Sequence, residues 1–316
     1  MPHPAILATR DGDVAVVTID RSAKRNAMDL PMWIALAEAI EAADADDDVR
    51  CVLVRGSGEE AFCAGADIAA FAHERGTPER EELYSREIGR GFQSLRKCRH
   101  PVVAACRGWT MGGGAGIATM ADFRVGGPGT RIGIPARNLG IWYAYGELDP
   151  LLESVGYAVA CELLIEGRVF TGEEAYQKGL LSRLVSDEAV KEEAMAMAKR
   201  IALGAPLSNR FHKRALQRLR GPLPVTAEEL RANGEESRAL RRDRVQLAAA
   251  LGGADGDVAE LLQQRQCRVD HARAGAVGAR HALLDRLDDL VAVARLLRQQ
   301  VQDHQAQVAM GEEAAK

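Results

Sequence analysis

Two glycine-containing stretches hold the residues of this chain whose types and spacing could do chemistry. The longer stretch, Pro101 to Asp122, reads PVVAACRGWTMGGGAGIATMAD and has three consecutive glycines at 112–114. Its apolar start is typical of a buried strand, and the small residues after the glycines have helical spacing. A strand that runs through glycines into a helix leaves free N–H groups that a ligand can approach closely. Such groups suit an oxygen that carries or gains negative charge.

Taken alone, the glycine run is compatible with a phosphate site, a packing turn or an oxyanion site. A Walker phosphate loop is excluded, because no Lys-Ser or Lys-Thr pair follows the glycines. The dinucleotide fingerprint also fits poorly, because its glycines should open a βαβ unit that has an acidic residue after the second strand. The oxyanion interpretation therefore stands beside a phosphate site of another kind and a plain packing turn.

The shorter stretch, AFCAGADI at residues 61–68, is a second loop of small residues directly after a strand. One interpretation is an ordinary strand-to-helix turn with Asp67 near a helix start. The other is that the backbone amide of Ala64 is a second N–H donor, which converges with the amide of Gly113. Under this second interpretation, both amides would donate to one oxygen.

The segments around these loops predict an α/β arrangement. Residues 14–19, 51–54 and 102–105 are β-branched or apolar runs typical of strands. Residues 30–43 have helical periodicity, with Pro31 in the first turn. The apolar face of this helix is predicted to contain Trp33, Leu36, Ala37 and Ile40. Strand, helix and strand at this spacing indicate alternating α and β elements.

Composition narrows the class of protein. The chain has 316 residues, of which 47% are hydrophobic, so it can build a sizeable core. The formal net charge of −4 favours neither nucleic acid nor an anionic membrane as a partner. No apolar run is long enough for a membrane helix, and residues 1–7 lack a signal-peptide pattern. The six cysteines contain no CxxC pair and are predicted to be reduced core residues of a cytoplasmic protein.

In this order the motifs resemble the enoyl-CoA hydratase/isomerase (crotonase) superfamily. The resemblance rests on AFCAGADI, on the glycine run, on Arg25-Asn26-Ala27-Met28 as an RNAL-like turn, and on residues 173–180, where a helix runs into Gly-Leu. It covers roughly residues 5–268. It implies an α/β fold, a crotonase-like spiral of ββα units with a helical C-terminal region. It also implies assembly as a homotrimer or a dimer of trimers.

The resemblance further implies a site for an acyl-CoA thioester. Ala64 and Gly113 would donate their N–H groups to the thioester carbonyl, and CoA would enter only as part of the substrate, with no other cofactor. Lys24 or Arg25 would meet phosphate, and solvated surface charge is the other interpretation of both residues. The expected substrate-binding residues are Lys24, Arg25, Ala27, Ala64, Gly65, Ala66, Asp67, Ile68, Gly112, Gly113, Ala136, Trp142 and Tyr143.

Several positions depart from the family pattern. Hydratases of this superfamily use two glutamates to add water to a double bond, and Gly116 and Ala136 stand at those positions here. Neither residue can exchange a proton, so efficient hydration is not expected. The acidic position of several isomerases falls at Ala144, and the histidine of the dehalogenase branch falls near Gly89. Isomerisation, decarboxylation and thioester hydrolysis stay open, as does a catalytically silent acyl-CoA-binding or assembly subunit.

The segment IWYAYGELD at residues 141–149 places three aromatic residues opposite the expected acyl pocket. Glu147 and Asp149 are the nearest acids and are therefore the candidate proton carriers. The other interpretation of the two acids is a helix whose first turn favours carboxylates. Tyr143 can donate a hydrogen bond or line the pocket with its ring.

Three parts are predicted along the chain. Residues 1–200 form the ββα spiral core with the CoA site, and within them a capping box at Thr171 and Glu174 starts a short helix that ends at Gly179. Residues 201–269 form a helical oligomerisation region. In residues 270–316, leucines and other apolar residues step by four and three over about three heptads. For this tail we expect packing or an oligomer contact rather than ligand binding.

Overall fold

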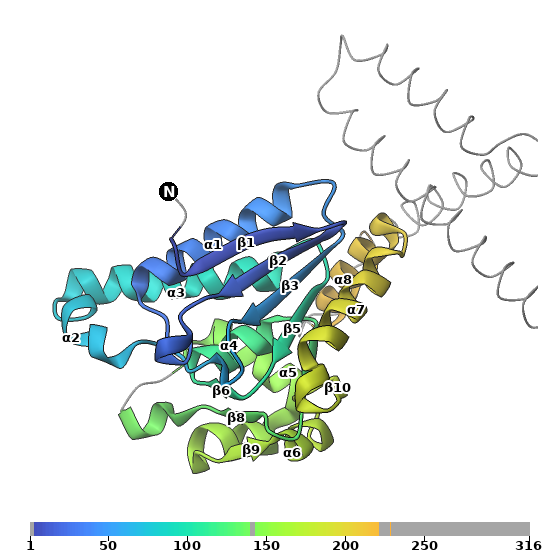
Figure 1. Ribbon diagram of the computed structural model, residues 1–316. Helices are drawn as coiled ribbons and strands as arrows, with labels where there is room; N and C mark the ends of the chain where they lie inside the picture. The colour runs from blue at the N-terminus through green and yellow to red at the C-terminus, as the bar shows by residue number, and fades with distance from the viewer. Residues whose placement is uncertain (1–2, 140–142, 221–227, 229–316) are drawn as a thin grey trace, which may run out of the picture. The chain divides into compact units, whose positions relative to one another are not determined.

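Figure 1 shows the computed structural model, which describes residues 3–139, 143–220 and 228. The chain divides into two compact units, Met1–Ala202 and Leu203–Lys316, and each is described by itself. In the described part of the second unit, residues 206–219 form a helix, α8 (Pro206–Leu219). All the elements described below belong to the first unit.

Some sequence predictions fall on residues outside these ranges. The heptad-patterned tail at 270–316 lies outside the described residues, as does the 201–269 region after residue 220 apart from residue 228. Trp142, an expected substrate-binding residue, also lies outside them. These assignments stay predictions.

A large, mostly parallel sheet forms the centre of the first unit. Its strand order in the described residues is β1-β2-β3-β5-β7-β10, and only β1 and β2 are antiparallel to each other. The predicted strands at 14–19, 51–54 and 102–105 are confirmed. The six strands are β1 (Ile6–Asp11), β2 (Val14–Ile19), β3 (Cys51–Gly56), β5 (Val102–Cys106), β7 (Phe123–Gly126) and β10 (Arg183–Leu184).

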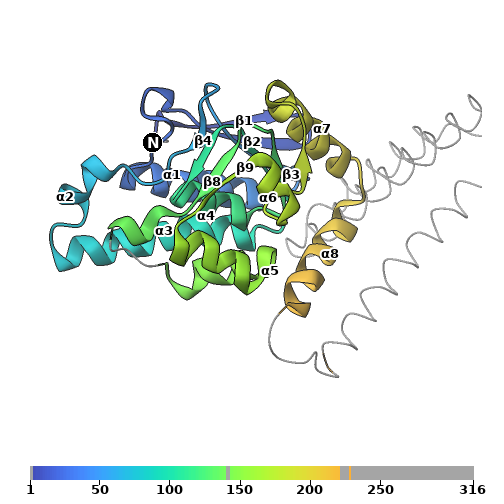
Figure 2. The same cartoon turned by 90° about the horizontal axis from the view of Figure 1, so that it is seen from below.

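Helices cover both faces of this sheet, as Figures 1 and 2 show. Successive side chains of a strand point to opposite faces. Val17 therefore packs in the core shared with α1 (Leu30–Ala45) and α3 (Pro78–Lys97), whereas Val16 packs toward α7 (Val190–Ala202). The predicted apolar face of α1 is confirmed: Trp33, Leu36, Ala37 and Ile40 are fully buried.

A smaller sheet lies beside the large one and has the order β4-β6-β8-β9 among the described residues. Its strands are β4 (Ala61–Cys63), β6 (Trp109–Met111), β8 (Arg131–Gly133) and β9 (Val169–Thr171), with only the last pair antiparallel. Because β4 and β6 are parallel neighbours, their carboxyl ends meet at one edge. The loop after β4 and the glycine run after β6 are therefore adjacent.

The chain repeats one order of elements: a strand of the large sheet, a strand of the small sheet, then helix. The pairs β3–β4 and β5–β6 are followed by α3 and by α4 (Gly113–Met120) respectively, and β7–β8 by α5 (Tyr145–Cys161). This repetition confirms the predicted spiral of ββα units. Gly156 interrupts α5 with a φ of +73°.

The capping box predicted near the end of this unit is confirmed. Thr171 Oγ1 accepts a hydrogen bond from the Glu174 N–H at 3.2 Å, and Glu174 Oε2 accepts one from the Thr171 N–H at 2.9 Å. The helix it starts, α6 (Gly172–Gln177), ends two residues earlier than predicted. Gly179 follows with a φ of +84°, a conformation that favours glycine.

Two further sequence expectations concern cysteines and membranes. Cys51, Cys63, Cys98 and Cys106 are buried free thiols, as predicted, and Cys161 is a partly buried free thiol. No helix in the described part of the chain combines the length and the apolar character that crossing a bilayer requires.

The capping box yields a first prediction. Thr171→Ala removes one of the two reciprocal hydrogen bonds, so the free energy of unfolding should fall by about 1 kcal/mol. Thr171→Ser keeps the hydroxyl and should lose much less. Urea unfolding of the three proteins measures the difference, and equal stability of all three would show that this cap contributes nothing.

Candidate active site

The turn between β2 and α1 is the first support of the site. Arg25 and Asn26 have φ values of +53° and +57°, in the left-handed region. The Asn26 side chain is fully buried: its Oδ1 accepts from the Arg21 N–H at 2.9 Å, and its Nδ2 donates to the carbonyls of Ser57 (3.0 Å) and Ala61 (2.8 Å). The asparagine of the RNAM motif therefore joins this turn to the start of β4.

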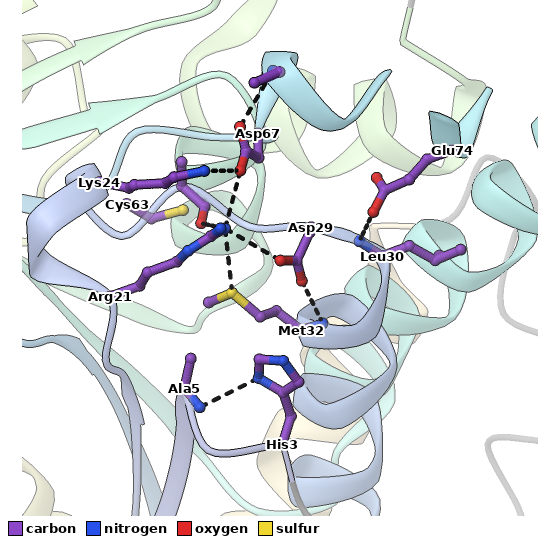
Figure 3. Close-up of polar contacts among 12 residues, drawn as sticks. His3, Ala5, Arg21, Lys24, Asp29, Leu30, Met32, Cys63, Asp67 and Glu74 are labelled. Carbon is purple, nitrogen blue, oxygen red and sulfur yellow. Dashed lines mark hydrogen bonds and ion pairs between the residues drawn. The ribbon is translucent and has the colours of Figure 1, made fainter. Parts of the chain in front are cut away.

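A cluster of charged side chains holds the loop that follows β4 (Figure 3). Asp67 Oδ2 lies 2.9 Å from Lys24 Nζ and 3.1 Å from Arg21 Nη1, and Arg21 Nη1 also lies 3.2 Å from Asp29 Oδ2. The Lys24 hydrogen bond is the main cause that lowers the pKa of Asp67, and the charges of Lys24 and Arg21 act in the same direction. Asp67 is therefore an ionised anchor of the loop.

The amide of Ala64, the expected first donor, is already used within the protein. Its N–H donates to the Arg25 carbonyl at 3.0 Å. On the other side of Gly65, Ala66 forms a parallel bridge with Met28, in which the Gly65 carbonyl accepts from Met28 and the Asp67 N–H donates to Met28, both at 2.8 Å. The hydrogen bond to Arg25 thus corrects the prediction that the Ala64 amide is free to meet a ligand.

This bridge leaves the Ala66 N–H free to donate a hydrogen bond to a ligand. In an extended pair, alternate residues direct their backbone groups to opposite sides, so the Ala66 N–H points away from Met28. Within the described residues it meets no hydrogen-bond acceptor. The loop of small residues therefore offers one free amide, two positions after the predicted one.

The glycine run after β6 supplies the second free amide. Gly112 has a φ of +52° and donates its N–H to the Gly133 carbonyl at 2.9 Å. Gly113 is the first residue of α4, where an N–H has no partner within the helix. Its predicted position as a donor at a helix start is consistent with this geometry.

The two loops touch through glycine. A Cβ added to Gly65, which has a φ of +99°, would lie 2.9 Å from the Met111 carbonyl oxygen and 3.2 Å from the Gly113 nitrogen. Any side chain at Gly65 would force the loops apart. The contact brings the segment that contains the Ala66 amide next to the Gly113 amide.

Tyr143 lies just before α5, and Glu147 lies in the first turn of that helix. Burial raises the pKa of Tyr143, with further contributions from nearby Glu147 and from Cys63, the last residue of β4. Glu147 Oε2 accepts from the Ala144 N–H at 2.8 Å. Burial raises the pKa of Glu147, against the opposing effect of this hydrogen bond. Tyr143 and Glu147 thus lie together, close to the end of β4.

Asp149, the second candidate proton carrier, lies elsewhere. Its side chain is 70% exposed, and its Oδ2 is 3.7 Å from Arg96 Nη2, in a surface ion pair. The structure therefore does not bring Asp149 to the two loops. Ala136, by contrast, packs against the main core from the short helix η3 (Pro135–Leu139).

The expected phosphate-binding residues are exposed but paired. Lys24 contacts Asp67, and Arg25 Nε lies 2.5 Å from Glu60 Oε1. Ile68 is exposed beside them at the start of the short helix η2 (Ile68–Ala70), and the Ala27 carbonyl accepts from Arg21 at 3.1 Å. Of these four residues, Lys24 belongs to the charged cluster of Figure 3. Among the described residues, no group of three His, Cys, Asp or Glu side chains could hold a metal ion.

Glu74, in α2 (Phe71–Glu74), has an unusual environment that the sequence does not reveal. Its Oε1 accepts from the Leu30 N–H at 2.9 Å, at the start of α1, while its Oε2 is buried and meets no partner among the described residues. Burial is the main cause that raises the pKa of Glu74, and the negative charges of Asp29 and Asp67 raise it further. No local sequence signal marks this residue, because the amide it caps is 44 positions away.

Known proteins are similar to this chain in both sequence and fold. The family model described as enoyl-CoA hydratase/isomerase matches residues 9–233. A probable enoyl-CoA hydratase of Rhizobium meliloti is 33% identical over 202 residues, which are 64% of this chain and 77% of the relative. A crotonyl-CoA hydratase of Syntrophomonas wolfei is 30% identical over 219 residues, which are 68% of this chain and 82% of the relative.

A solved structure gives the same result for the fold. The crystal structure of an enoyl-CoA hydratase/carnithine racemase from Magnetospirillum magneticum superposes with a TM-score of 0.73. It is 38% identical in sequence, and the match covers 79% of this chain and 93% of that chain. The similarity thus extends over nearly the whole length of that protein.

The environment of Glu74 predicts how stability depends on pH. A carboxyl whose pKa is raised by folding contributes stability below its unfolded pKa and loses it as the pH rises through the folded pKa. Glu74→Gln cannot ionise and can keep the hydrogen bond to Leu30. The variant should therefore be more stable than the wild type at pH 7, and the gap should close toward pH 4.

The measurement is urea unfolding from pH 4 to pH 8. Glu38→Gln, at an exposed position of α1, is the matched control and should show no such gain. A constant difference between Glu74→Gln and the wild type at every pH would contradict the prediction.

Proposed function

The chain belongs to the enoyl-CoA hydratase/isomerase family, and on that premise we propose that it binds an acyl-CoA thioester and stabilises negative charge on the thioester oxygen. The observation that supports this most strongly is the glycine contact between the two loops, each of which has a free amide. In this proposal Ala66 and Gly113 are the donors, and Ala64 holds the first loop against Arg25.

Two preorganised amides would act on the carbonyl in the way that an oxyanion hole does. They donate to the oxygen as charge develops on it, either when a proton leaves the α-carbon or when a nucleophile adds to the carbonyl carbon. Each such donor contributes about 10²–10³-fold in rate. The site would therefore favour enolate or tetrahedral oxyanion chemistry.

Glu147 is the proposed proton carrier. Its pKa is raised by burial, which moves a carboxyl closer to the range where it can both accept and release a proton near neutral pH. Tyr143 lies beside it and supplies a phenol and an apolar ring. Asp149, exposed and paired with Arg96, is the weaker candidate.

The proposed reaction is isomerisation, decarboxylation or thioester hydrolysis rather than efficient hydration. Gly116 and Ala136 supply no group that could activate water or protonate the α-carbon. A catalytically silent acyl-CoA-binding subunit is the alternative from another class. A screen of CoA thioesters separates the two, since binding without turnover of any thioester would favour the silent subunit.

The remaining parts of the proposal concern CoA and assembly. The loop from Ala64 to Asp67 and the turn around Lys24 would hold CoA, and Lys24 or Arg25 would exchange its carboxylate partner for phosphate. We propose that the protein works as a homotrimer or a dimer of trimers in the cytoplasm.

Replacing single amides by esters tests the donor assignment. An ester linkage in place of the peptide N–H of residue 66 removes one donor without changing any side chain. Turnover should fall by about 10²–10³-fold. A small loss of stability should accompany it, because the ester carbonyl of Gly65 accepts more weakly from the Met28 N–H. The same replacement at residue 64 breaks the hydrogen bond to Arg25 and should lower stability by about 1 kcal/mol while leaving turnover nearly intact. The reverse pattern would return the donor role to Ala64.

Glu147→Gln tests the proton carrier. The amide keeps the size and the hydrogen bond to Ala144 but cannot act as a base, so turnover of the true substrate should fall by about 10²–10⁴-fold while CoA binding persists. The wild-type rate should rise with pH through the raised pKa of Glu147, and this rise should vanish in the variant. Fast crotonyl-CoA hydration by the wild type, undiminished in Glu147→Gln, would refute both the assignment and the reaction class.

A further inference from the structure

Helix α4, which presents the Gly113 amide, has little to hold its own first turn in place. Its sequence is GGAGIATM, and each interior glycine costs a helix about 1 kcal/mol relative to alanine. Gly112 precedes it and provides no side-chain cap. The position of the first turn must therefore come from neighbouring elements.

Two aromatic rings fill the volume that the glycines of α4 leave. A Cβ added to Gly113 would lie 2.8 Å from Cζ2 of Trp33, and one added to Gly116 would lie 2.7 Å from Cε1 and Cζ of Phe92. Both rings are almost completely buried, with exposed fractions of 0% and 2%. The first turn of α4 thus lies directly on these rings.

The rings also support each other. Trp33 of α1 and Phe92 of α3 meet edge to face, with centroids 5.0 Å apart and an interplanar angle of 66°. The other edge of Trp33 abuts α3, because a Cβ added to Gly91 would lie 3.1 Å from Cε3 of that ring. The Trp33 indole N–H is buried and meets no acceptor among the described residues, so packing holds the ring.

Helix α3 also contacts the segment that carries Glu147. A Cβ added to Gly146 would lie 3.3 Å from the Gln93 side-chain amide, and Arg96 Nη2 lies 2.7 Å from Glu153 Oε2. Phe92, Gln93 and Arg96 are successive contacts of one helix with α4 and α5. The same stretch of α3 therefore supports both α4, which presents the Gly113 amide, and α5, whose first turn contains Glu147.

We propose that Phe92 and Trp33 are positioning residues, which hold the first turn of α4 so that the Gly113 N–H faces the thioester oxygen. The proposal rests on the proposed function of that amide. The rings act through the glycines: any side chain at 113 or 116 would displace them, and any loss of ring volume would let the turn move. Phe92 also occupies the space into which a side chain at 116 would extend.

The test compares Phe92→Leu with Phe170→Leu. Phe170 in β9 is also fully buried, so both substitutions remove ring volume from the core, but Phe170 is not among the nearest neighbours of the α4 glycines. Phe92→Ala and Trp33→Phe extend the series. Urea unfolding first establishes how much global stability each variant loses.

Hydrogen exchange of the Gly116 amide is the first readout, because its hydrogen bond to the Gly112 carbonyl at 3.0 Å closes the first turn of α4. After correction for the loss of global stability in each variant, the exchange rate of the Gly116 amide should be about tenfold higher in Phe92→Leu than in Phe170→Leu. Equal acceleration in the two variants would overturn the proposal whatever the reaction is.

The second readout is the affinity for an acyl-CoA thioester relative to the thioether that lacks the carbonyl oxygen. Phe92→Leu should lower this ratio by about tenfold, Phe92→Ala should lower it further, and affinity for CoA alone should not change. Phe170→Leu should keep the ratio. If the wild type prefers the thioester and Phe92→Leu keeps the full preference, this inference alone is overturned. A wild type with no preference would refute the proposed function, and the inference with it.

Discussion

The contact between Gly65 and the corner formed by Met111, Gly112 and Gly113 is the constraint on which the site depends. Parallel pairing of β4 and β6 brings two loops to one edge of the small sheet, but pairing alone leaves room for side chains between them. The two loop backbones approach so closely that a Cβ added to residue 65 would lie 3.2 Å from the Gly113 nitrogen. Only glycine permits this approach. The free amides of the two loops lie close together because these backbones touch.

The two loops are held by different forces. Hydrogen bonds and charge hold the first, through Arg25, Asn26 and the pairing of Asp67 with Lys24 and Arg21. Packing holds the second, because α4 has neither a polar cap nor side chains at Gly113 and Gly116. A polar anchor keeps its strength only while its charges remain, whereas a packed anchor depends on volume and is insensitive to pH.

Charge near the site is arranged unevenly. Asp67 is stabilised as a carboxylate by its basic neighbours, whereas burial disfavours the ionised forms of Glu74 and Glu147. The three carboxyls thus differ in environment, and each environment follows from its hydrogen-bond and ion-pair partners: cations for Asp67, a backbone amide for Glu74 and for Glu147. In the proposed function, Glu147 is the acid that moves a proton, because it combines this environment with a position beside Tyr143.

The sequence by itself determined the strands at 14–19 and 102–105, the buried face of α1, the capping box at Thr171 and the family. These features depend on periodicity and on short motifs, which are local. Only the tertiary structure decided which amide is free, because the Arg25 carbonyl, 39 positions earlier in the chain, takes the Ala64 N–H. It also decided that Asp149 faces solvent and that the ring of Phe92 fills the space beside Gly116. Such contacts join residues distant in the chain, and no periodicity encodes them, since they arise only when separate elements of the fold pack together.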